Sequence, residues 1–191
     1  ILINKKRGNL ISFDKYGNND KFIFSSNLGL ENIQSQFFLM GTDKFGRDFF
    51  SRIIYVMKVS LTIGFLSVLI SLAIGIFLGS ISGFYGGNID KAIMWLINVT
   101  WSIPTLLLVI AISLAIGKGF NQVFIAIGLT MWVDVARIVR GQFMSLKEKE
   151  FVEAGEVLGY KSSRLIVKHI LPNILSTILV ISTANFSAAI L

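Results

Sequence analysis

The sequence predicts an all-α membrane protein, a bundle of helices that crosses the bilayer several times. Hydrophobic residues make up 53% of the 191 residues and charged residues only 15%, with a mean hydropathy of +0.71. Soluble domains carry about 25% charged residues. The charges are also clustered, and three long stretches have none: residues 59–89, 92–117 and 170–191.

Each uncharged stretch is long enough to cross the hydrocarbon core, which takes about 20 apolar residues. A charge at the centre of such a helix costs roughly 2.5–3.5 kcal/mol. A fourth run, residues 119–133, is shorter and spans only if its helix continues past Asp134 towards Arg137. The expected spans therefore lie at about 61–84, 92–116, 122–139 and 173–191.

The chain divides near residue 57 into a polar segment and a transmembrane domain. Residues 1–57 are expected to form an extracytoplasmic segment that becomes helical towards its end, and residues 58–191 the transmembrane domain. A charged loop, residues 141–172, separates the third and fourth spans. More basic residues lie in or beside that loop than close to the first span, and this bias places the loop in the cytoplasm. The basic residues of the whole segment 1–58 count against this orientation, although long segments translocate largely regardless of charge.

Small residues occupy every fourth position of the first span and so share one helix face. They are Ser67, Ser71, Gly75, Gly79 and Gly83. This spacing lets another helix approach closely. We expect Ser71, Gly75, Gly79 and Gly83 to be helix-packing residues, and their partner is either a helix of this chain or a second subunit.

The second and third spans each contain one unusual residue. Pro104 removes an intrahelical hydrogen bond and predicts a kink in the second span. Asp134 is an acid within a membrane helix, which is by default a candidate functional residue. Because Arg137 follows at i+3, we favour a salt bridge near the membrane surface over a substrate or proton site.

The loop before the fourth span contains a short amphipathic helix. Its apolar residues fall at i, i+3, i+4 and i+7 and are Phe151, Ala154, Gly155 and Leu158. Gly159 can adopt a left-handed conformation and end this helix. Ser162 or Ser163 can cap a second helix, residues 164–170, and Pro172 suits the first turn of the fourth span. Such an elbow either lies on lipid or enters a groove on a partner.

The composition excludes several classes of site. Without cysteine the chain has no disulfide and no thiolate metal site, and the single histidine, His169, does not build a metal site alone. The spans hold no paired acids and no Ser/His pair, and no phosphate-binding Gly-x4-Gly-Lys-Ser/Thr loop is present. We therefore expect no catalytic residue, cofactor or metal in this chain, and we expect the net charge of +7 to reflect cytoplasmic loops rather than nucleic-acid binding.

The loop sequence carries a family resemblance. Glu153-Ala154-Gly155, Gly159 and Leu171-Pro172 resemble the E-A-A-x3-G-x9-I-x-L-P loop of ABC importer permeases, with Gly155 in place of the second Ala and His169 in place of Ile. The run His169–Asn173 is typical of the peptide branch. Further matches to the dipeptide/oligopeptide permease "C" subunits are Gly41-Thr42-Asp43-x2-Gly46-Arg47-Asp48-x2-Ser51-Arg52, Gly83–Gly87 and Ala136-Arg137-x2-Arg140-Gly141.

The resemblance implies the type I ABC importer permease fold, with the four spans here as helices two to five of six. Since the chain begins at Ile1 and ends inside an apolar run, we expect a fragment of a longer protein. The loop from Glu153 to Pro172 would dock on a separate ATPase. The docking residues would be Phe151, Glu153, Ala154, Gly155, Leu158 and Gly159.

By the same resemblance, the protein would be a non-catalytic permease of the cytoplasmic (inner) membrane that imports peptides. Its partners would be a second permease subunit in a heterodimer, two ATPases that bind ATP and Mg²⁺, an extracytoplasmic substrate-binding protein and membrane lipid. A nickel or other small-solute permease of the same family is the first alternative. A membrane scaffold without transport activity is the second.

Overall fold

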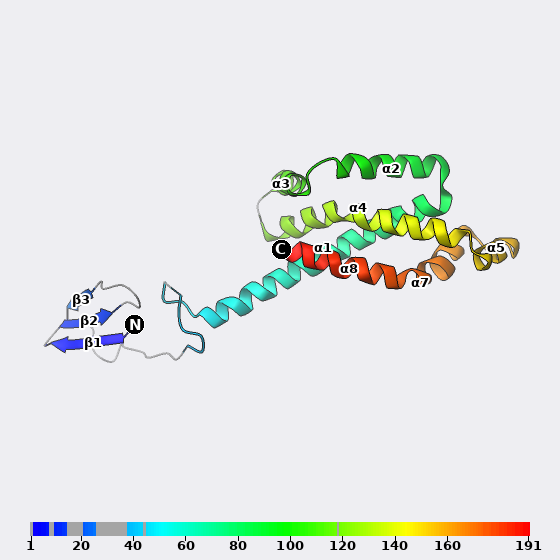
Figure 1. Cartoon of the computed structure of the whole chain (residues 1–191). Helices are drawn as coiled ribbons and strands as arrows, with labels where there is room; N and C mark the ends of the chain where they lie inside the picture. The colour runs from blue at the N-terminus through cyan, green and yellow to red at the C-terminus, as the bar shows by residue number, and fades with distance from the viewer. Residues whose placement is uncertain (1, 8–9, 15–20, 26–37, 44, 118) are drawn as a thin grey trace. The chain divides into compact units, whose positions relative to one another are not determined.

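Figure 1 shows a computed structural model of the chain. It describes residues 2–7, 10–14, 21–25, 38–43, 45–117 and 119–191. The chain divides into two compact units, residues 1–58 and 59–191. The boundary falls within one continuous helix, α1, Phe49–Tyr85.

The first unit contains an antiparallel sheet of three strands in the order β1-β2-β3. The strands are β1 Leu2–Arg7, β2 Leu10–Asp14 and β3 Lys21–Ser25. These strands were not predicted from the sequence. Their short runs of β-branched and aromatic residues, such as Phe22-Ile23-Phe24, suit a pleated strand and are much too short to span a membrane.

The second unit is all-α over its described residues, which confirms the predicted helical class for the membrane domain. After α1 come α2 Gly87–Trp101, α3 Thr105–Ile116, α4 Phe120–Lys147 and α5 Glu150–Val157. The chain continues through α6 Ser162–Arg164, a π-helix Leu165–Ile170, α7 Leu171–Asn173 and α8 Leu175–Ile190.

Two helices, α1 and α4, are individually long and apolar enough to cross a membrane. Two further spans are possible if each of two bent helix pairs counts as one. The pair α2 and α3 is bent by 94°, and the pair formed by residues 162–173 and α8 is bent by 66°. The structure therefore allows up to four spans.

The bend expected at Pro104 is a full break between two helices rather than a kink. Residues 102–104 lie between α2 and α3. The Ser102 hydroxyl and the Ser102 backbone N–H both donate to the carbonyl oxygen of Asn98. These bonds close the last turn of α2, while Pro104 has no N–H with which to continue the ladder.

The helices pack around two groups of buried side chains. The larger group joins α1, α4, α5, the π-helix and α8; its members are Phe84, Val135, Val139, Phe143, Val152, Leu165, Ile170, Ile174 and Ile178. The smaller group joins α2 to α4 through Ile97, Trp132, Val133 and Ala136. The larger group fixes the elbow that follows α4 to the rest of the bundle (Figure 1).

Candidate functional site

Helix α5 is attached to the bundle by a face that includes only one residue of the predicted apolar pattern, Gly155. Val152 is fully buried and belongs to the same cluster as Phe143 and Leu165. Gly155 is also buried, and a Cβ there would lie 2.7 Å from Leu165 Cδ2. These two positions form the inner face of α5.

The outer face of α5 is apolar and exposed. Phe151 is 41% exposed, Leu158 69% and Val157 84%, and Ala154 is exposed beside them. The structure thus separates the four residues of the expected apolar face. Phe151, Ala154 and Leu158 face outward, whereas Gly155 faces the bundle. Glu153 and Glu156 are exposed as well.

Gly159 ends α5 in the left-handed conformation expected of it, with φ of 74°. Its N–H donates to the Glu156 carbonyl oxygen at 2.9 Å, and the N–H of Tyr160 donates to that of Gly155 at 3.0 Å. Two bonds of this kind close the helix end and reverse the chain direction. The exposed α5 surface is therefore held by a defined turn.

Tyr160 connects this turn to the following helices. Its ring is stacked on the His169 ring with a centroid distance of 5.6 Å, and the Arg164 guanidinium lies 4.1 Å from its centroid. A Cβ at Gly155 would also lie 3.3 Å from Cδ2 of the Tyr160 ring. The two residues that depart from the family motif, Gly155 and His169, therefore both lie beside the Tyr160 ring.

The second helix of the elbow differs from the expected one. It begins at Ser162 with Lys161 at the N-cap and no side-chain cap bond, so neither Ser162 nor Ser163 caps a helix over residues 164–170. Residues 165–170 form a π-helix instead. Pro172 lies in the first turn of α7, and α8 begins only at Leu175.

The small-residue face of α1 packs against α4 of the same chain. A Cβ at Gly75 would lie 2.5 Å from Val135 Cβ, and one at Gly83 would lie 2.6 Å from Phe143 Cβ. A Cβ at Gly79 would lie 2.6 Å from the Ala136 carbonyl oxygen. Each glycine thus lets the backbones approach more closely than any larger residue would allow.

The two serines of this face make polar contacts. Ser67 Oγ donates to the Phe124 carbonyl oxygen of α4 at 3.1 Å. Ser71 Oγ accepts a bond from Asn185 Nδ2 of α8 at 3.4 Å, and both residues are buried. The same face of α1 therefore holds α4 and α8.

A polar cluster closes the end of the bundle where α1 meets α2. Arg140 of α4 forms a salt bridge with Asp90 of α2, and Ser82 of α1 donates to the same carboxylate. Lys147 Nζ donates to the Phe84 carbonyl oxygen at 2.8 Å. This cluster was not predicted, although Asp90 and Lys91 alone separate two long uncharged stretches of the sequence.

Asp134 does not form the expected salt bridge with Arg137. The Arg137 guanidinium lies over the Trp101 ring at 4.1 Å, and its Nη2 donates to Asn98 Oδ1 at 3.4 Å. Among the described residues, the Asp134 carboxylate has no hydrogen bond or ion pair. The expectation was wrong because Trp101, at the end of α2, attracts the guanidinium across the helix interface.

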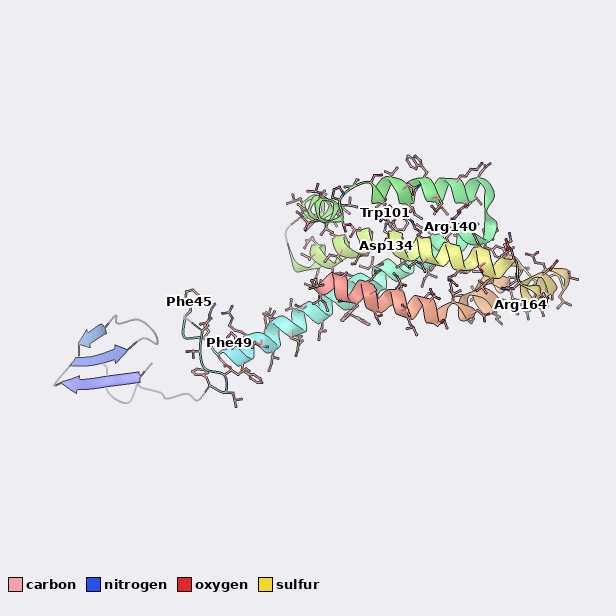
Figure 2. All side chains as sticks on the ribbon, in the orientation of Figure 1. Phe45, Phe49, Trp101, Asp134, Arg140 and Arg164 are labelled. Atoms are coloured by element: carbon pink, nitrogen blue, oxygen red, sulfur yellow. The ribbon has the colours of Figure 1, made fainter. Side chains whose placement is uncertain are left out.

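Asp134 instead lines a pocket between α4 and the break that separates α2 from α3. The pocket has a volume of about 240 Å³. Trp101, at the end of α2, and Asp134, on α4, both line it and are labelled in Figure 2. Three threonines, Thr100, Thr105 and Thr130, are among its lining residues.

A loop in the first unit explains the motif that begins at Gly41. Asp43 accepts hydrogen bonds from the backbone N–H groups of Phe45 and Arg47 and from the side chains of Arg47 and Arg52. Desolvation acts to raise the pKa of Asp43, but these bonds outweigh it and lower the pKa to about 2. Asp48 then caps α1 by accepting from the N–H groups of Phe50 and Ser51.

Within the part of the chain that the structure describes, no group of three or more His, Cys, Asp or Glu side chains is placed to hold a metal ion. The two candidate sites are the exposed apolar face of α5 and the pocket lined by Asp134.

Comparison with known proteins matches residues 75–191 to the family "Binding-protein-dependent transport system inner membrane component". The oligopeptide transport system permease protein OppC of Bacillus subtilis is 43% identical over 150 residues, which cover 78% of this chain and 49% of the relative. The dipeptide transport system permease protein DppC of the same organism is 41% identical, over 78% of this chain and 47% of its own length. OppC of Escherichia coli K12 is 36% identical, over 79% and 50%. The chain spans about half the length of these curated relatives.

Proposed function

Because this chain belongs to the family of binding-protein-dependent transport system inner membrane components, we propose that it is a permease subunit of an ATP-driven importer that carries peptides across the inner membrane. The similarity to oligopeptide and dipeptide permeases supports the peptide as substrate. Nickel or another small solute is the alternative within the family.

The outer face of α5 is the surface we assign to a partner ATPase. Three large apolar side chains, Phe151, Val157 and Leu158, are exposed there at the tip of an eight-residue helix. At about 100° per residue they share an arc with Ala154. An amphipathic helix of this kind enters an apolar groove on its partner. Its length and its single apolar face suit a groove better than an extended lipid contact.

The attachment of α5 supports its role as a lever. Val152 anchors the helix in the cluster that also contains Val139 of α4 and Ile178 of α8. A force applied to the outer face is therefore passed to two membrane helices through packed side chains rather than through a flexible loop. We propose that ATPase closure moves α4 and α8 in this way.

Partner proteins would supply ATP hydrolysis, the other half of the translocation path and substrate delivery. ATP hydrolysis would be supplied by two ATPase subunits, and the given sequence contains no phosphate-binding loop of its own. The translocation path would lie between this chain and a second permease subunit, and an extracytoplasmic binding protein would deliver the substrate. In this proposal the chain itself contributes no catalytic residue.

The test uses the full-length transporter with its partner subunits. Leu158→Asp and Glu153→Lys should each abolish co-purification of the ATPase and reduce ATP-dependent peptide uptake, because the first places a charge in the apolar face and the second reverses a charge beside it. Glu156→Gln is the matched control, since it changes a charge on the same helix outside the apolar arc. Unchanged ATPase binding and uptake in Leu158→Asp, with the protein folded, would rule out docking through α5.

A further inference from the structure

We propose that the pocket between α4 and the α2–α3 break binds the protonated amino group of the transported substrate, with Asp134 as its counter-ion. This inference rests on the proposed function, because it assigns part of the substrate path. In it, Asp134 recognises the amino group of the substrate within the membrane domain.

The depth of Asp134 is the first argument. It lies 14 residues after Phe120, where α4 begins, or about 21 Å along the helix at 1.5 Å per residue. The hydrocarbon core is about 30 Å thick. A carboxylate at this depth is costly against lipid, and such residues face a bundle interior or a water-filled cavity. The Asp134 side chain, which is exposed on this chain, is therefore expected to face a water-filled cavity rather than lipid.

The absence of a counter-ion is the second argument. The nearest arginine in the sequence, Arg137, is held by Trp101 and Asn98. Arg140, one turn further on, is engaged with Asp90. In the described part of the chain Asp134 is thus left without a positive partner, and a ligand cation can take that place.

The hydrogen-bonding character of the wall is the third argument. Thr100 Oγ1 donates to the Leu96 carbonyl oxygen at 2.9 Å, and Thr130 Oγ1 donates to that of Ile127 at 2.8 Å. A hydroxyl whose hydrogen is used in this way can still accept. The two threonine hydroxyls and the Asp134 carboxylate therefore offer hydrogen-bond acceptors, which suit an ammonium group with its three N–H donors.

The size of the pocket indicates one end of a substrate rather than a whole peptide. Small-molecule sites usually enclose about 300–1,000 Å³, and this pocket has about 240 Å³. A single carboxylate is also a poor site for a divalent metal, which prefers several protein ligands. The amino terminus of a peptide fits both the volume and the charge.

The experiment measures binding of a labelled tripeptide and of its N-acetylated form to the assembled transporter in nanodiscs, without binding protein or nucleotide. The wild type should prefer the free-amine form. Asp134→Asn should weaken binding of that form by about tenfold, the loss expected for a charge-assisted hydrogen bond, and leave the acetylated form unchanged. Asp134→Glu should retain most of the preference. Glu148→Gln removes a similar charge from the end of α4 and should change nothing.

An Asp134→Asn variant that still prefers the free-amine form would overturn the proposal. If that variant does not assemble, Thr130→Val provides the second test. It should reduce binding of the free-amine form several-fold and leave binding of the acetylated form unchanged. If Thr130→Val binds the free-amine form as tightly as the wild type does, the proposal is overturned. ATP-driven peptide uptake by the wild type is measured separately. Its absence would disprove the proposed function, whereas uptake with unaltered amine preference in Asp134→Asn would disprove the pocket alone.

Discussion

Arg140 and Asp90 form a bidentate ion pair between α4 and the first turn of α2. Arg140 Nε lies 2.5 Å from Asp90 Oδ1, and Nη2 lies 2.6 Å from Oδ2. The two side chains are only 23% and 17% exposed. The pair is therefore shielded from most of the solvent screening that weakens ion pairs at a surface.

Removal of either partner should destabilise the protein. We expect Asp90→Ala and Arg140→Ala each to cost about 2 kcal/mol, because each leaves a largely buried charge without a partner. Arg140→Lys should recover only part of this loss, since an ammonium does not reproduce the two parallel bonds. Unfolding of the purified protein in a denaturing detergent measures these values. A coupling energy below about 0.5 kcal/mol in the double-mutant cycle would contradict a strong pair.

Enlarging a glycine of the α1 face should separate α1 from α4. Gly79→Val should cost about 1–3 kcal/mol by overpacking, because even its Cβ would lie 2.6 Å from a backbone oxygen. Gly141→Ala is the matched control. No atom lies within 4 Å of a Cβ at that position, and the alanine should be neutral or stabilising by up to about 1 kcal/mol. Thermal melting of both variants provides the comparison, and equal melting temperatures would argue against the packing role of Gly79.

Restoring the family alanine at position 155 should be unfavourable in this chain. The new Cβ would lie 2.7 Å from Leu165 Cδ2, and Leu165 is buried with little room to move. We expect Gly155→Ala to cost about 1 kcal/mol. The cost should shrink in a Leu165→Val background, where the contacting methyl group is absent. The same cost in both backgrounds would show that another contact is responsible.

The loop around Asp43 should resist acid. The pKa of Asp43 is lowered from 3.8 to about 2, so its contribution to stability is complete above pH 4 and is lost as the pH falls through about 2. The stability difference between the wild type and Asp43→Asn should therefore be constant above pH 4 and vanish towards pH 2. Titration of the carboxyl carbon by NMR measures the pKa directly. A value near 3.8 would mean that the hydrogen bonds from Arg47 and Arg52 do not persist in solution.

Hydropathy and charge located the apolar segments of the chain, and the structure allows two to four of them as membrane spans, but these patterns did not predict where the helices end. The α4 helix was expected to end near residue 139 and continues to Lys147. The first helix begins at Phe49, within the stretch expected to become helical before the span, whose own start was expected at about residue 61. In both cases the extra turns carry charged residues, which a bilayer excludes but a helix outside it tolerates. Transfer free energies predict which residues lie in the hydrocarbon core, but they do not predict how far a helix continues outside it.

Tertiary contacts account for the features that the sequence did not predict. Val152 was overlooked because it lies outside the i, i+3, i+4, i+7 pattern of α5, and only the bundle reveals that it is the anchor. The pairing of Arg137 with Trp101 instead of Asp134 depends on how α2 folds back, which no local spacing encodes. In contrast, the left-handed Gly159 and the close-packed glycines of α1 were predictable, because backbone sterics at those positions favour one residue type.

The packing of α1 on α4 repeats with the same period on both helices. The glycines lie four residues apart, and the backbone oxygens they approach, those of Trp132, Ala136 and Arg140, are also four apart. Sliding one helix by a single turn would therefore bring most of these contacts back into an equivalent arrangement. Van der Waals packing alone distinguishes poorly between such alignments. The Asp90–Arg140 pair and the Lys147–Phe84 hydrogen bond each occur once in the repeat, and such polar contacts give the turns of α4 unique neighbours on α1 and α2.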